Sequence, residues 1–151
     1  MERTPPSRSR AAFGVIARDN GGAVQWWFAG RVVASSALLT EAWALRVACL
    51  AARDMGLDSA VFESDCLELV HCLQDSEAAC PWEIYAIIED IRLWASSASN
   101  WVFVWCKRNR NKVAHWIAQQ CLSGSLVNLP GCIPPDLERL VATDVAIPLD
   151  A

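Results

Sequence analysis

The sequence lacks several features that would assign it at once to a functional class. No apolar run approaches the roughly 18 residues of a membrane-spanning helix, and residues 1–10, MERTPPSRSR, lack the apolar core of a signal peptide. The 151-residue chain has a formal net charge of −4, so it has no overall attraction to nucleic acid. We therefore expect a protein without a membrane partner, whose basic binding surface, where one exists, is confined to one segment.

Paired cysteine motifs are also absent. The chain has seven cysteines, an odd number, and none forms a Cys-x-x-Cys pair, so the usual ligand spacings of a structural zinc site are missing. Several cysteines fall at apolar positions of periodic segments. This favours reduced, mostly buried thiols of an intracellular protein over a disulfide framework. The sequence does not distinguish nucleus from cytoplasm and does not specify an oligomeric state.

The composition favours a packed domain, because 54% of the residues are hydrophobic and 20% are charged. The length is that of one ordinary domain. We expect a disordered segment over 1–12, a folded domain over 13–122 and a C-terminal tail over 123–151. Within that tail, residues 135–145 (PDLERLVATDV) either form a short helix or lie over the surface.

Apolar periodicity and turn residues predict the elements of the domain. An Asn-Gly-Gly turn at 20–22 joins two strands into a hairpin, and Gly56 is expected to cap a helix at its C-terminal end. The predicted elements are strands over 11–19, 23–33, 59–64 and 100–109, and helices over 40–55, 66–75, 82–98 and 112–122. Strand–helix–strand connections of this length imply parallel pairing, so we expect a mixed α/β sheet with helices on both faces.

Two acidic residues stand out in this arrangement. Glu41 heads the apolar stripe of its helix, where an uncompensated buried carboxylate is costly. Asp65 follows a strand at its carboxyl end, where open α/β sheets place ligands. A hard divalent cation with oxygen ligands would relieve the repulsion between two such carboxylates.

Each candidate residue also has a purely structural explanation. Glu41 in the first turn of a helix capped by Thr40 is favoured by the helix dipole. Asp65 could act as the N-cap of the next helix, and His115 as a half-buried packing histidine. The basic segment 107–112 could be a solvated turn with Asn111 as the helix N-cap.

Several motifs together resemble the plant reverse-transcriptase-like branch of the type 1 ribonuclease H family. They occur in the family's order and cover about 13–122. The matching segments are GVIARDNGG (14–22), TEAWALRVACLAARDMGL (40–57), FESDCLELVHCL (62–73), IIEDIRLW (87–94) and RNRNKVAHWIA (108–118).

The resemblance implies a ribonuclease H fold and cleavage of the RNA strand of an RNA–DNA hybrid, with Mg²⁺ or Mn²⁺ as the cofactor. It assigns catalytic positions to Glu41, Asp65 and His115, and metal ligation to Glu41 and Asp65. His115 stands at the position of the fourth family acid; neutral imidazole suits magnesium poorly but could move a proton or steer a phosphate.

The turn before the last helix carries four positive charges between Lys107 and Lys112, so we expect a nucleic-acid-binding surface there. The residues assigned to it are Lys107, Arg108, Arg110, Asn111 and Lys112.

The chain departs from the family pattern at its beginning. The family starts with a central strand that carries an Asp-Gly pair and supplies the first acid. Residues 1–12 contain no aspartate, and Pro5 and Pro6 disfavour strand pairing. Three outcomes are open: this segment fills the gap poorly, the sheet rearranges, or the sequence is a truncated version of a longer chain, which we favour.

Three functions are compatible with these observations. The first is a metal-dependent ribonuclease acting on hybrids. The second is a degenerate module that holds RNA–DNA hybrid or other nucleic acid without cutting it, through contacts that salt would weaken. The third is a fragment that has neither activity.

Overall fold

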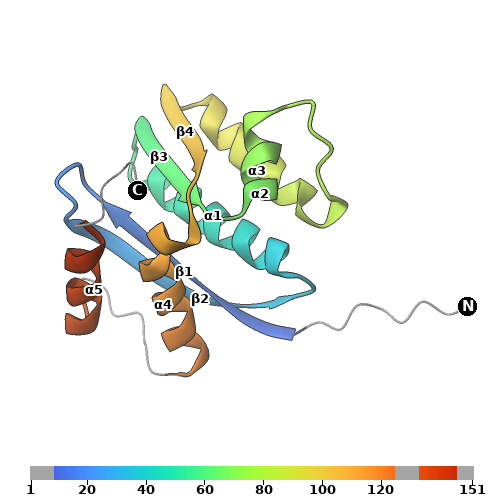
Figure 1. Ribbon diagram of the computed structural model, residues 1–151. Coiled ribbons are helices and arrows are strands. Elements are labelled where there is room, and N and C mark those ends of the chain that lie inside the picture. Colours follow the sequence, from blue (N-terminus) through green and yellow to red (C-terminus); the bar gives the residue numbers. More distant parts are fainter. Residues whose placement is uncertain (1–8, 125–132, 146–151) are drawn as a thin grey trace, which may run out of the picture.

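The computed structural model describes residues 9–124 and 133–145 (Figure 1). Residues 9–12, which we expected to be disordered, form the start of the first strand, whereas the prediction for 1–8 lies outside the described residues. The elements in chain order are β1 Ser9–Arg18, β2 Val24–Ala34, α1 Ala37–Asp54, β3 Ser59–Ser64, α2 Leu67–Gln74, the 3-10 turn η1 Trp82–Ile84, α3 Tyr85–Ser96, β4 Asn100–Trp105, the 3-10 turn η2 Arg108–Arg110, α4 Lys112–Leu122 and α5 Pro135–Val145.

The strands form two separate two-stranded sheets. β1 pairs antiparallel with β2, and β3 pairs parallel with β4. The predicted parallel pairing is therefore confirmed for β3 and β4, but the prediction of one continuous mixed sheet is wrong for the described residues. The physical reason is that no described strand lies between β1 and β3 to bridge the two ladders. This break falls between the hairpin and the strand that ends at Ser64, where the resemblance implies a missing central strand.

Local sequence signals define the hairpin turn and the end of α1. The Asp19 carboxylate accepts hydrogen bonds from the backbone N–H groups of Gly21 and Ala23, each at 2.9 Å. At the end of α1, Gly56 has a φ of 68°, a left-handed conformation that glycine adopts at little cost. Its N–H and that of Leu57 donate to carbonyls of the last helical turn, as in a Schellman motif. Both turn predictions are confirmed.

The helices cover the sheets unequally. α1 lies against both β1 and β3, and α4 packs on β1 and β2 from the other side (Figure 1). One apolar cluster joins α1, α2 and α3 to Phe62 of β3, and a second joins α4 and α5 to Ala29 of β2. α1 therefore spans the break between the two sheets and holds their facing edges apart.

The close approach of β1 and α4 depends on Gly14. A Cβ atom built on Gly14 would meet the carbonyl oxygen of Ala114 and would lie 2.6 Å from the Cβ of Ile117. We expect Gly14→Val to destabilise the protein by about 1–3 kcal/mol, the usual cost of overpacking. Urea unfolding of both proteins measures the difference. Gly21→Val is the control, because a Cβ there would contact only the Asp19 side chain, at 3.4 Å. Equal losses in both variants would contradict the role of Gly14.

The described part of the C-terminal tail contributes to the core. α5 buries Leu137 and Val141 in the cluster formed with α4, so the short-helix alternative holds for these residues. Four of the six described cysteines are buried, which agrees with the prediction of mostly buried cysteines. Among the described residues, no helix has both the length and the apolar character required to cross a membrane.

Candidate functional site

Glu41 lies in the second turn of α1. The helix begins at Ala37, and its cap is Ser36, whose hydroxyl accepts a hydrogen bond from the Leu39 N–H at 3.1 Å. Thr40 is inside the helix, so the explanation of Glu41 as a first-turn acid behind a Thr40 cap is wrong. The Glu41 side chain is half-buried. The helix is capped by Ser36 and not by Glu41.

Asp65 follows β3 and belongs to no helix. The N-cap of α2 is Cys66, which excludes the capping explanation for Asp65. Its carboxylate oxygen Oδ2 lies 2.8 Å from His115 Nε2, in the first turns of α4. The hydrogen bond orients the imidazole, so His115 is more than a packing residue.

Glu41, Asp65 and His115 come together from three separate elements. One potential ligand atom of each lies within 4.8 Å of the other two, and all three residues are half-buried. Two carboxylates and one imidazole fit a divalent cation, since the carboxylates suit Mg²⁺ or Mn²⁺ and the imidazole tolerates transition metals better than magnesium. The arrangement can therefore hold a cation, with Glu41 and Asp65 as the hard ligands.

The carboxylate of Glu41 is difficult to ionise in this position. Burial raises its pKa above the ordinary value, and the nearby negative charge of Asp65 raises it further. His115 and Arg108 act in the opposite direction. A bound cation would favour the charged form, so metal binding and ionisation of Glu41 should be coupled.

Glu41→Gln is expected to stabilise the metal-free protein at neutral pH. Because the folded-state pKa of Glu41 is raised, ionised Glu41 destabilises the fold above that pKa, and the penalty disappears as pH falls towards the ordinary value of 4.5. The difference in melting temperature between variant and wild type, measured in EDTA, should be largest at neutral pH and shrink on acidification. A variant that melts below the wild type throughout this range would contradict the assignment.

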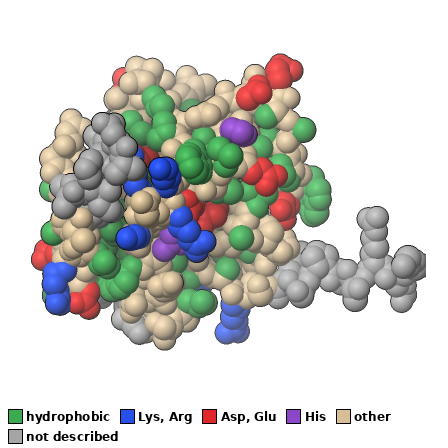
Figure 2. Space-filling model, viewed as in Figure 1, with side chains coloured by type: hydrophobic (Ala, Val, Ile, Leu, Met, Phe, Trp, Pro, Cys, Tyr) green, Lys and Arg blue, Asp and Glu red, His purple; other side chains and the backbone are tan. Residues whose placement is uncertain are grey.

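A basic segment borders the three-residue cluster. Lys107, Arg108 and Lys112 are exposed, and Arg110 pairs with Glu63 of β3 at 3.5 Å. Figure 2 shows blue side chains gathered beside a histidine and acidic side chains, over the region where η2 and α4 meet in Figure 1. Asn111 takes the N-cap position of α4, but its side chain makes no capping hydrogen bond.

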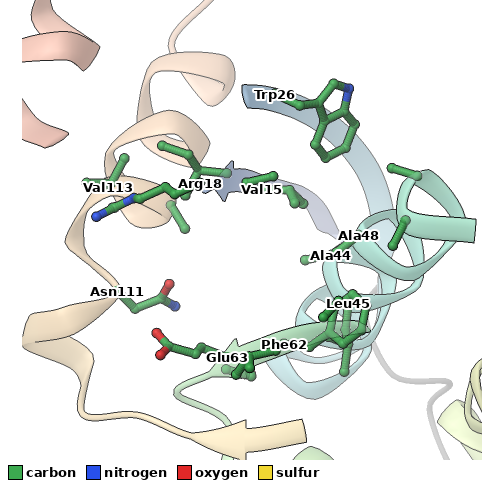
Figure 3. A pocket seen from close by; sticks show the side chains of 18 of the residues that line it. Val15, Arg18, Trp26, Ala44, Leu45, Ala48, Phe62, Glu63, Asn111 and Val113 are labelled. Atoms are coloured by element: carbon green, nitrogen blue, oxygen red, sulfur yellow. The ribbon is translucent and has the colours of Figure 1, made fainter. Parts of the chain in front are cut away.

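A cavity of about 640 Å³ begins at Glu41 and runs between β1 and β3. Figure 3 shows the side chains of Asn111 and Glu63 facing one end of it, with Val15 of β1 and Ala44 of α1 on other sides. The cavity connects the cluster to the break between the sheets.

Sequence reasoning did not identify Trp105 as part of the site. Its indole N–H donates to the Asp65 carbonyl at 3.2 Å, and the Cys106 N–H donates to the Ser64 carbonyl at 3.0 Å. These two bonds position the backbone that carries the Asp65 carboxylate. Trp101, Phe103 and Trp105 alternate along the sequence, which predicts a shared face of β4 but not this hydrogen bond.

Comparison with known protein families shows which family the chain belongs to. Residues 5–121 match the family described as reverse transcriptase-like. The chain belongs to the reverse transcriptase-like family. The match begins before Phe13, where the motif-based resemblance began, and includes all three residues of the cluster. Among curated proteins, none matches this sequence.

Solved structures support the fold of this reverse transcriptase-like chain. It is similar to RNase H1 from the halophilic archaeon Halobacterium salinarum, with a TM-score of 0.71, 18% identity, and coverage of 81% of this chain and 92% of the other. It is also similar to the N-terminal RNase H domain of a Mycobacterium tuberculosis protein, solved as a fusion with maltose-binding protein. That TM-score is 0.71, with 15% identity and coverage of 78% and 86%. At these identities, the likeness establishes a ribonuclease H-like fold.

Proposed function

We propose that this chain binds RNA–DNA hybrids through the basic segment around η2 and presents to the RNA strand a reduced metal site made of Glu41, Asp65 and His115. The observation that carries this proposal is the convergence of the three side chains within 4.8 Å of one another, beside exposed Lys107 and Arg108. The ribonuclease H titles of the two similar structures support the choice of substrate class.

The basic segment provides the contact with the nucleic-acid backbone. Lys107, Arg108 and Lys112 are exposed and can each approach a phosphate, and the Asn111 side chain makes no cap bond that would compete with a ligand. The ion pair with Glu63 holds Arg110 against β3, so Arg110 can position the segment as well as bind. Because the net charge of the chain is −4, we assign the phosphate contacts to this local basic surface and not to the charge of the molecule as a whole.

In this proposal, a phosphodiester held by the basic segment lies beside the cluster. Bound there, Mg²⁺ or Mn²⁺ would supply charge stabilisation to a phosphate oxygen. Glu41 and Asp65 would hold the cation, and the Trp105 indole fixes the backbone of Asp65. His115, oriented by its 2.8 Å bond to Asp65, can hold a proton at Nε2 that it shares with that carboxylate.

Hydrolysis of the RNA strand is the second candidate function. The convergence of two carboxylates favours it, and the presence of His115 at the fourth acidic position opposes it. The direct hydrogen bond between Asp65 and His115 favours binding without cleavage, because it engages one carboxylate oxygen. We also propose, on the motifs at 14–22, 40–57 and 108–118, that the chain belongs to the plant branch of the family.

Binding and cleavage of one labelled substrate separate these functions. We expect the purified chain to bind an RNA–DNA hybrid in EDTA, with log affinity falling against log salt by about 0.9 per neutralised phosphate. RNA-strand products are then sought in Mg²⁺ and in Mn²⁺. Products that require the cation and disappear in Asp65→Asn would establish hydrolysis. Binding without products would leave the module function, and the absence of binding at low salt would refute the proposal.

A further inference from the structure

The side chains of Cys72 and Cys80 meet where the chain passes from α2 towards α3. Cys72 lies in the last turn of α2 and is 2% exposed, and Cys80 lies just before η1 and is half-buried. The two thiols are joined by a side-chain hydrogen bond, and both pack in the apolar cluster that joins α1, α2 and α3. Sulfur atoms in this contact need only a small movement to reach the length of a disulfide bond, about 2.05 Å.

The two thiols differ in their access to solvent. Burial, the hydrogen bond to Cys80 and the charge of its thiolate raise the pKa of the Cys72 thiol to about 12, so Cys72 is a poor first nucleophile. Cys80 is half-buried, and residues 75–77 and 79 of the connection before it are exposed. A reagent from solution therefore reaches Cys80 first. Once the Cys80 sulfur is bonded to the reagent, it no longer carries the charge that opposes ionisation of Cys72.

The segment that carries Cys80 is attached to the start of α1. Glu83, in η1, accepts hydrogen bonds from the Ser35 hydroxyl at 3.1 Å and from the Ser36 hydroxyl at 3.0 Å, and Ser36 is the N-cap of α1. α2 and α3, which this segment connects, lie side by side (Figure 1). A covalent bond between Cys80 and α2 would therefore tie α2 to the start of α1.

We propose that Cys72 and Cys80 are a redox-responsive thiol pair, which a low-molecular-weight disulfide such as oxidised glutathione converts to an intramolecular disulfide that ties α2 to the start of α1. The Cys80 thiolate attacks one sulfur of the reagent, which breaks the reagent's S–S bond and leaves a mixed disulfide. Cys72 then loses its proton and attacks the Cys80 sulfur. Each departing thiolate takes up one of the two cysteine protons, so the protein loses two electrons and the reagent becomes two thiols. The inference does not depend on the nucleic-acid function proposed above.

Peptide mapping tests the pairing, because glutamates separate the cysteines. Cleavage after glutamate gives the peptides 64–68, 69–77 and 78–83, which carry Cys66, Cys72 and Cys80 in turn. The folded full chain is treated with oxidised glutathione, and its remaining thiols are blocked with N-ethylmaleimide before cleavage. We expect 69–77 and 78–83 to appear as one disulfide-linked species, which dithiothreitol separates.

Three variants distinguish the parts of the two thiols. In Cys72→Ala, glutathione should remain attached to Cys80, because no second thiol displaces it. In Cys80→Ser, Cys72 should stay reduced, because it is buried. Cys66→Ser is the matched control: Cys66 is half-buried, as Cys80 is, but it lies outside the pair, so the linked species should form as in the wild type.

The structural effect of the disulfide is measured on the oxidised wild type. Hydrogen exchange should slow over residues 75–83 and at the start of α1, and the melting temperature should rise by about 3–8 °C, as expected for closing a loop of this length. Linkage of 64–68 to either of the other peptides, a glutathione adduct that persists at Cys80 in the wild type, or linkage that forms only in urea would overturn the thiol pair. Unchanged exchange in the linked protein would overturn the tie between α2 and α1.

Discussion

Replacing Asp65 with asparagine is expected to remove specific Mn²⁺ binding. The variant keeps an amide in place of the carboxylate that lies 2.8 Å from His115, so the local geometry can persist while one of the two hard charged ligands is lost. We expect the Mn²⁺ affinity to fall by about 100-fold or more, at least the loss seen when outer-shell partners of metal ligands are removed. Isothermal titration calorimetry measures this directly, and any metal-dependent RNA cleavage should be lost with it.

Glu68→Gln is the matched control for this experiment. Glu68 is an exposed carboxylate in the first turn of α2, close in sequence to Asp65 but outside the three-residue cluster. The control has the same change in net charge and should bind Mn²⁺ as the wild type does. Equal affinities for the wild type and Asp65→Asn would show that the cluster is not a metal site.

The double change Lys107→Ala and Arg108→Ala is expected to weaken hybrid binding by about tenfold or more at low salt, with a decrease of about 2 in the salt slope. Both side chains are exposed, and neither is held in a described ion pair. Arg110 is left in place, because its ion pair with Glu63 supports the local structure. Fluorescence anisotropy over a series of salt concentrations measures both quantities.

Arg53→Ala with Arg139→Ala is the matched charge control. Arg53 lies near the end of α1 distant from Glu41, and Arg139 lies on α5, so neither belongs to the basic segment. This pair removes the same charge and should reduce affinity only slightly. If the two double variants lost affinity equally, binding would reflect overall charge and not the surface around η2.

Much of the local structure was predictable because it depends on short-range physics. The Asn-Gly-Gly turn, the glycine after α1 and the apolar periodicity each act over a few residues. The bounds of β3 and α4 agree with the predictions at 59–64 and 112–122. α1 begins at Ala37, three residues before the predicted start at Thr40, because Ser36 caps the helix.

The candidate site was predictable only in part. The sequence places Glu41 on an apolar stripe and Asp65 after a strand, which indicates that the two acids could lie close together. In the structure they do, and His115 lies beside them. The hydrogen bonds between these side chains and their partners were not predictable, because they depend on the directions of the side chains in space. Examples are the bond between Asp65 and His115 and the Trp105 indole on the Asp65 carbonyl.

The sequence by itself determined the element types, the reduced state expected of the thiols and the reverse transcriptase-like motifs, since these depend on composition and on spacing along the chain. Only the tertiary structure decided that the strands form two sheets and that a cavity separates β1 from β3. Strand pairing between distant segments depends on which backbone edges the packed helices bring within hydrogen-bonding reach. α1 contacts β1 and β3 together, and it holds their edges on opposite sides of that cavity.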